Sequence, residues 1–381
     1  MKKTELTLFK LLHIALTDSR DYLIPEDVNW TELFQLACDQ GVVALVCDGL
    51  QEIADAGVKI SALTDSVHGK RLKLSLIGQA MAVKETGERQ MDSAKQLSKL
   101  WAKNGIRTLV LKGMAFGSYY PIPNHRFCVD MDCYLMWFKD QGSRLKDEDN
   151  VVGAWELGNG LIERLGIEVK KEDYRHSTFF YGDLHVENHK ICTTVRGRKQ
   201  RKVFEKYLRG LLENEPTTCI ADSNLEVPCP MFNALYFLQH AHRHFLRECI
   251  TLRHICDWAM ITDKCKDKIN WDEFRTIAEQ NDLLSFAESM TRLANVVCGV
   301  KCDALTKEYA MQPQDRMLLD DCYAISDNVI KYGNDFKAHL QMVKNLINQR
   351  WKHKYFSKYS FITEILTSVW GVFFEKNPEI D

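Results

Sequence analysis

Two aspartates in the middle of the chain form a candidate site for a divalent cation. Asp130 and Asp132 stand two residues apart in residues 127–135, a segment that predicts a β-strand. Because side chains alternate along a strand, both carboxylates would lie on one face. Such a pair repels unless a cation lies between the two acids or one is protonated. Mg²⁺ binds one or two carboxylates together with substrate phosphate oxygens, so it is the cation that this pair would suit.

A glycine turn upstream of these aspartates could hold phosphate groups. Residues 106–111 predict a short strand, Lys112 and Gly113 follow it, and residues 114–120 predict about two turns of helix. Glycine allows the backbone to approach a phosphate closely, and a helix N-terminus attracts anions. Taken alone, however, this motif is better explained by a glycine that only turns a strand into a helix.

Three polar side chains alternate along a later segment that also predicts a strand. Asp183, His185 and Glu187 would share one face by the period of two. A third acid beside Asp130 and Asp132 could complete a two-metal site or accept the proton of a hydroxyl group. The alternative is an edge strand whose polar face is solvated.

The elements that would position these motifs predict an α+β fold. Helical periodicity dominates residues 1–104, strands mix with helices over residues 105–228, and helical patterns return over residues 229–381. The sequence therefore predicts a small mixed-sheet core, 105–228, flanked by an N-terminal helical region, 1–104, and a C-terminal helical region, 229–381. Two strands are expected, at residues 176–181 and 183–188, with Gly182 at a tight turn between them.

Composition restricts the classes of function. The 381 residues include 50 Lys and Arg and 52 Asp and Glu, a formal net charge of −2 that argues against a general nucleic-acid binder. The 13 cysteines are scattered without a C-x-x-C pair, which indicates reduced thiols rather than a disulfide framework. No secretory signal is visible, and the longest apolar stretch, 361–374, is too short to cross a bilayer. We therefore expect a cytoplasmic protein without a membrane partner.

The order of these motifs resembles the uncharacterised nucleotidyltransferase family of the polymerase-β-like superfamily. That family has a strand ending in Leu-Lys-Gly, a Tyr-Pro stretch, an arginine, an Asp-hydrophobic-Asp strand, and a later strand with an acid, a hydrophobic residue and a histidine. The matching residues here are Leu111-Lys112-Gly113, Tyr120-Pro121, Arg126, Asp130-Met131-Asp132 and Asp183-Leu184-His185. The helical segments 238–244 and 252–258 are also similar, and the resemblance covers roughly residues 5–300.

The resemblance implies a nucleotidyltransferase core that moves a nucleoside monophosphate from an NTP to a hydroxyl acceptor. By this resemblance, Mg²⁺ would bind the three catalytic acids, and the nucleotide would contact a further group of residues. The acids are Asp130, Asp132 and Asp183, and the nucleotide-binding residues are Lys112, Gly113, Arg126 and His185. The acceptor is not specified: a protein, an RNA and a small molecule are all compatible with the pattern.

One departure from the superfamily pattern keeps two other interpretations open. Superfamily members have Gly-Gly or Gly-Ser at the phosphate turn, whereas Met114 follows Gly113 here; Gly117-Ser118 could serve as that turn instead. A nucleotide-binding or scaffolding protein that retains the fold without catalysis is one alternative. A glycosyltransferase with an Asp-x-Asp metal site is the other, and the helical first hundred residues disfavour it.

Two further clusters have a polar-packing interpretation as well as a functional one. His240 and His244 have the i, i+4 spacing of a helical zinc pair, but no third ligand is evident. The basic run 196–202 could contact RNA phosphates, although a solvated helix start explains it more simply.

Overall fold

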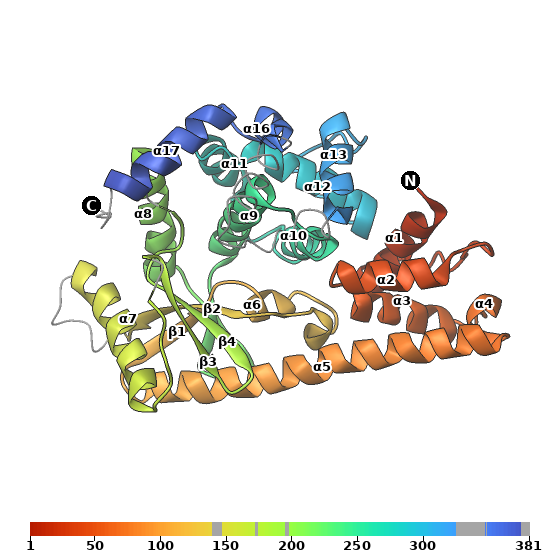
Figure 1. Ribbon diagram of the computed structural model, residues 1–381, viewed down its shortest axis with the longest axis horizontal. Coiled ribbons are helices and arrows are strands. Elements are labelled where there is room, and N and C mark those ends of the chain that lie inside the picture. Colours follow the sequence, from red (N-terminus) through yellow and green to blue (C-terminus); the bar gives the residue numbers. More distant parts are fainter. Residues whose placement is uncertain (139–146, 172–173, 195–197, 325–346, 348, 375–381) are drawn as a thin grey trace, which may run out of the picture. The chain divides into compact units, whose positions relative to one another are not determined.

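The computed structural model describes residues 1–138, 147–171, 174–194, 198–324, 347 and 349–374 (Figure 1). Their contacts divide the chain into two compact units. One unit combines Met1–Met81 with Phe237–Trp370, and the other is built on Ala82–Tyr236. The sequence-based division placed the N-terminal and C-terminal helices in separate regions, whereas this contact pattern groups them in one unit.

The first unit is helical. Its elements are α1 Lys3–Leu16, α2 Trp30–Asp39, α3 Val43–Asp55, α4 Ser61–Thr64, α10 Leu252–Lys264, α11 Trp271–Gln280, α12 Leu284–Cys298, α13 Pro313–Tyr323, α16 Arg350–Phe356 and α17 Phe361–Phe374. Local residues define several ends: the Asn29 side chain accepts a hydrogen bond from Glu32 N at the start of α2, and Gly299, with φ of +74°, ends α12.

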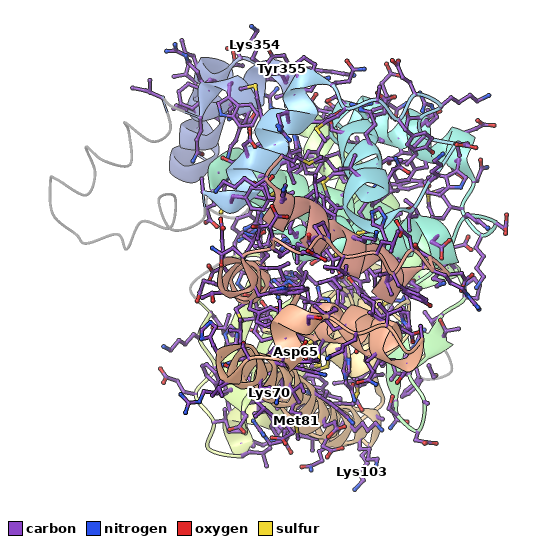
Figure 2. The ribbon with its side chains drawn as sticks, turned by 90° about the vertical axis from the view of Figure 1, so that its right-hand side faces the viewer. Asp65, Lys70, Met81, Lys103, Lys354 and Tyr355 are labelled. Atoms are coloured by element: carbon purple, nitrogen blue, oxygen red, sulfur yellow. The ribbon has the colours of Figure 1, made fainter. Side chains whose placement is uncertain are left out.

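Three of the described helices belong to both units. α5, Val67–Ala102, α9, Pro230–Arg247, and α17 each contain a boundary between the units. The side chains of Lys70 and Met81 project from α5 into solvent (Figure 2). Among the described residues, none of the helices combines the length and the apolar character that crossing a membrane requires.

The second unit contains a six-stranded mixed sheet with the order β3-β4-β2-β1-β6-β5. β1 is antiparallel to β2 and parallel to β6, while β4 is parallel to β2 and antiparallel to β3. This mixed sheet among helices confirms the predicted α+β class. The elements are β1 Ile106–Val110, α6 Met114–Gly117, the 3₁₀ turn η1 Pro123–His125, β2 Met131–Trp137, α7 Asp147–Arg164, β3 His176–Tyr181, β4 Leu184–His189, α8 Lys199–Asn214, β5 Thr218–Cys219 and β6 Leu225–Val227.

One face of the sheet is apolar and is packed against helices. α7 lies on β2, and the C-terminal part of α5 runs beside the same unit's sheet (Figure 1). Trp101 of α5 packs edge-on against Phe179 of β3 and donates a hydrogen bond to Gly158 O of α7, at 3.2 Å. A β-carbon at Gly158 would lie only 2.2 Å from Leu135 Cδ1, so glycine permits this close helix–strand approach. The opposite face is therefore the one on which polar side chains can gather.

The predicted elements differ from the observed ones mainly at short strands and at ends. The aspartate strand starts at Met131, four residues later than predicted, because its pairing with β4 begins at that residue. The prediction missed β5 and β6, which are too short to show alternation. Within the helical region expected at 229–381, residues 325–346, 348 and 375–381 fall outside the described residues.

Candidate active site

Lys112 lies against both aspartates of the Asp-x-Asp motif. Its Nζ is 3.0 Å from Asp132 Oδ2 and 3.8 Å from Asp130 Oδ2. Asp132 is fully buried in β2, and Asp130 immediately precedes that strand. Burial disfavours the charged form of Lys112, but the nearby carboxylates, Asp132 first, outweigh it and raise its pKa. The chain thus brings the predicted acids together and already holds one cation between them.

Gly113 brings the turn after β1 into contact with the loop that carries Asp130. Its φ is +64°, and a β-carbon there would lie 2.9 Å from Cys128 Sγ and 3.1 Å from Asp130 O. Any other residue would be strained and would push this loop away. Gly117, the alternative phosphate turn, approaches Pro123 O instead. Of the two glycines, Gly113 is the one beside the acids.

Arg126 supplies a second positive charge next to the same loop. Its Nη1 donates to Phe127 O at 3.0 Å. Burial raises the pKa of Asp130, while the charges of Lys112 and Arg126 oppose that shift. Burial and the two cations therefore have opposite effects on the pKa of Asp130, so a bound ligand could change its protonation state.

Glu187, rather than Asp183, lies beside the aspartate pair. In the parallel β2–β4 ladder Glu187 pairs with Asp132, so the two side chains share a face. Donor atoms of Asp130, His185 and Glu187 all lie within 4.8 Å of one another. Asp183 stands at the β3–β4 turn, where it is exposed and lies 3.4 Å from Arg89 Nε. The structure thus gathers His185 but not Asp183 with the Asp-x-Asp motif.

His189, which the sequence interpretation did not single out, completes the cluster. Its Nε2 lies 2.9 Å from Asp132 Oδ1 and 3.6 Å from Glu187 Oε2. Burial lowers the pKa of His189, but hydrogen bonds to Asp132 and Glu187 outweigh this and raise it to about 9. The signal was available in the sequence, because His189 continues the alternation of His185 and Glu187.

The donor set of this cluster suits a divalent cation with a preference for oxygen. Asp130 and Glu187 keep about a quarter of their side chains exposed, at 25% and 23%, so an ion can reach them from solvent. Their two carboxylates match the number that Mg²⁺ takes from proteins. Three acids face two cations, Lys112 and His189, so one negative charge is left over among these five groups. The residues therefore fit Mg²⁺, with Lys112 as its nearest competitor.

The other polar clusters show structural contacts. The rings of His240 and His244 lie 4.5 Å apart and are tilted by 48°, and His244 lies near Glu248. Neither histidine belongs to a three-ligand group among the described residues. Part of the basic run, 195–197, falls outside the described residues.

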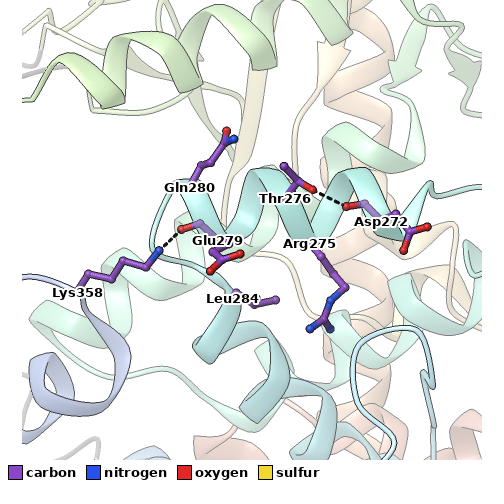
Figure 3. Close-up of a pocket in the computed structure, with 7 residues that line it drawn as sticks. All are labelled: Asp272, Arg275, Thr276, Glu279, Gln280, Leu284 and Lys358. Carbon is purple, nitrogen blue, oxygen red and sulfur yellow. Dashed lines mark hydrogen bonds between the residues drawn. The ribbon is translucent and has the colours of Figure 1, made fainter.

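A polar hollow of about 550 Å³ lies on α11 of the helical unit (Figure 3). Its cations are engaged in structural contacts: Lys358 Nζ donates to Glu279 O, and Arg275 donates to Leu305 O. It therefore offers no catalytic group comparable to the acid cluster.

Comparison with known proteins agrees with the chemistry of the acid cluster. A family model described as an uncharacterised nucleotidyltransferase matches residues 26–299, which include the whole cluster. No curated protein and no solved structure matches the chain.

Proposed function

This chain belongs to the uncharacterised nucleotidyltransferase family, and we propose that it transfers a nucleoside monophosphate from an NTP to a hydroxyl acceptor with Mg²⁺. The observation that carries the proposal is the convergence of Asp130, Asp132 and Glu187 on one sheet face beside Gly113. Family membership favours nucleotidyl transfer over glycosyl transfer at this Asp-x-Asp motif.

Two of the three acids would bind the metal, and the third would supply a fixed negative charge. Asp130 and Glu187, which are partly exposed, would hold Mg²⁺, with His185 as a third nearby donor. When bound, the metal would neutralise phosphate charge and favour ionisation of the attacking hydroxyl. Asp132 is fully buried, and Lys112 and His189 contact its two oxygens, so it would act as a fixed anion of the site.

The remaining residues would orient the nucleotide. The acceptor oxygen would bond to the α-phosphorus as the bond to the pyrophosphate oxygen breaks, so catalysis would be mainly positioning and charge neutralisation. Lys112 and Arg126, both near Asp130, would bind the triphosphate and the departing pyrophosphate. The acceptor, whether protein, RNA or small molecule, is left open.

The first test is a thermal-shift titration with each NTP, with and without Mg²⁺. We expect the wild type to be stabilised only when both are present, because Mg²⁺ would offset the repulsion between the acids and the triphosphate. Asp130→Asn should remove that shift while leaving the melting temperature of the apo protein close to wild type, since Asp130 is partly exposed. Absence of any NTP-dependent shift in the folded wild type would sink the proposal.

A second pair of variants identifies the third acid. Glu187→Gln should weaken Mn²⁺ binding, used as a paramagnetic probe for the Mg²⁺ site, by about tenfold or more, because it removes one carboxylate ligand. Asp183→Asn should leave Mn²⁺ affinity unchanged, because Asp183 is exposed at the turn and pairs with Arg89. Electron paramagnetic resonance of free Mn²⁺ measures both. Weaker Mn²⁺ binding in Asp183→Asn than in Glu187→Gln would instead identify Asp183 as the third acid.

A non-catalytic nucleotide-binding protein is the second candidate, and one observation favours it. Lys112 and His189 already contact both oxygens of Asp132, so two of the three negative charges are balanced without a metal. Nucleotide binding that is insensitive to Mg²⁺ and to Asp130→Asn would support this alternative.

A further inference from the structure

The strand next to the acid cluster exposes a large aromatic side chain. β3 buries Phe179 on its apolar face, at 3% exposure, and leaves the adjacent Phe180 63% exposed on the other face. Single exposed apolar residues are common on protein surfaces, so exposure alone assigns nothing. What distinguishes Phe180 is where the strand ladder places it.

The register of three neighbouring strands aligns Phe180 with the acids. Phe180 pairs with His185 in the antiparallel β3–β4 ladder, and Glu187 pairs with Asp132 in the parallel β2–β4 ladder. Directly paired residues point to the same face, and so do residues two apart on one strand. Phe180, His185, Glu187 and Asp132 therefore share one face of the sheet.

His185 connects the aromatic surface to the acid cluster. Its ring lies 4.9 Å from the ring of Phe180, with the two planes at 40°. A donor atom of the same imidazole lies within 4.8 Å of carboxylate oxygens of Asp130 and Glu187. The chain thus presents, side by side, a charged cluster suited to metal-bound phosphates and an open aromatic ring.

From this juxtaposition we propose that Phe180, backed by His185, is the stacking surface for the nucleobase of the bound NTP. The inference rests on the proposed function, because it takes the phosphates to lie at the acids. Adjacent strands are about 4.8 Å apart, which places β3 two strand spacings, roughly 10 Å, from the aspartates of β2. A nucleotide whose phosphates lie over β2 and β4 extends its sugar and base toward β3.

The chemistry of this surface also predicts its selectivity. Every nucleobase has a π-face, so stacking on an aromatic ring tolerates any base. Phe180 carries no donor or acceptor that could distinguish one base edge from another. The four NTPs should therefore bind with affinities of the same order, and purines should bind somewhat more tightly because they cover more of the ring.

The test separates the base from the phosphates. Affinities of ATP, CTP and inorganic tripolyphosphate are measured by calorimetry in the presence of Mg²⁺ for the wild type, Phe180→Ala and Phe180→Tyr. We expect Phe180→Ala to weaken both nucleotides by about tenfold or more and to leave tripolyphosphate unchanged. Phe180→Tyr, which keeps the ring, should stay within about threefold of the wild type.

Val203→Ala is the matched control, because Val203 of α8 is also 63% exposed. Equal nucleotide affinity in Phe180→Ala and Val203→Ala would overturn the stacking surface. So would a loss of affinity in Phe180→Ala that is as large for tripolyphosphate as for the nucleotides. If Asp130→Asn abolishes nucleotide binding while Phe180→Ala does not, the proposed function stands and this inference falls. A folded wild type that binds no NTP would remove both.

Discussion

Lys112 occupies the space between Asp130 and Asp132 that a divalent cation would share. Its ammonium group stabilises two neighbouring carboxylates in the absence of metal, at 3.0 Å and 3.8 Å. The same positive charge repels an approaching metal ion and attracts phosphate oxygens. Lys112 therefore has opposite effects on the two ligands of the proposed reaction.

Removing the positive charge of Lys112 should therefore change the affinities for metal and for phosphate in opposite directions. Lys112→Met should increase Mn²⁺ affinity, by severalfold, because it removes a competing cation, and should decrease affinity for tripolyphosphate in the presence of Mg²⁺. It should also lower the melting temperature of the metal-free protein, since Asp130 and Asp132 then lose the ammonium group that lies close to both. Mn²⁺ titration by electron paramagnetic resonance, tripolyphosphate calorimetry and thermal unfolding measure the three effects.

Lys103→Met is the control for this variant, because Lys103 is exposed just beyond α5 (Figure 2). It should change none of the three quantities. Weaker Mn²⁺ binding in Lys112→Met would contradict the competition and would mean that the ammonium group organises the acids for the metal.

The roles of individual residues were only partly predictable from the chain. Period-two alternation predicted that Asp130 and Asp132 would share one face, and that the three polar residues of the later strand would share a face of their own. It could not choose between Asp183 and Glu187, because both follow the same alternation; the choice depends on the register of β4 against β2, which pairs Glu187 with Asp132. Register arises from tertiary packing, which no local pattern reports.

At the scale of elements, predictions succeeded where local signals were strong. The helical pattern expected over residues 229–381 is confirmed by helices such as α11, whose start is capped by Asn270 and whose apolar period is clear. β5 and β6, with two and three residues, carry no recognisable alternation and were missed. Their positions are set by pairing rather than by their own sequence, because β6 pairs with β1 and β5 pairs with β6.

A buried carboxylate joins α8 to the segment after β4. Glu205 of α8 is fully buried, and its two oxygens accept hydrogen bonds from Cys192 N and Thr193 N, at 3.0 and 2.8 Å. Burial raises the pKa of Glu205 to about 7, although these hydrogen bonds and the charges of Arg209 and His189 favour the ionised form. Ionisation of Glu205 should therefore destabilise the folded state, because the cost of burying the charge exceeds what these contacts return.

The resulting pH dependence has a definite sign. Folded Glu205 holds its proton more tightly than the unfolded chain, whose pKa is near the ordinary 4.5. Its contribution to stability is therefore present below pH 4.5 and is lost as pH rises to about 7, at most about 3 kcal/mol. The free energy of unfolding of the wild type, relative to Glu205→Gln, should fall between pH 5 and pH 8. Urea denaturation of both proteins across this range measures it, and a constant difference would refute the linkage.

At the scale of the whole chain, residues far apart in sequence build one helical unit. Gln40, at the end of α2, is buried, and its amide connects three parts of that unit. Its Oε1 accepts from Leu252 N at the start of α10, and its Nε2 donates to Cys322 O in α13, both at 2.8 Å. Cys322 lies beyond the family match, so this later segment takes part in the same core.

Cooperative unfolding of this unit is the consequence that can be measured. Gln40→Ala leaves a buried N–H and a buried carbonyl without their partner, so it should lower the free energy of unfolding by about 2–4 kcal/mol. Gln51→Ala, which removes an exposed hydrogen bond to Asp55, should cost less than about 0.5 kcal/mol. Hydrogen exchange followed by mass spectrometry should show that Gln40→Ala reduces protection in both α2–α3 and α10–α12, because one folding unit opens as a whole. If protection falls in α2–α3 alone, the N-terminal and C-terminal helices are separate folding units, as the sequence pattern suggested.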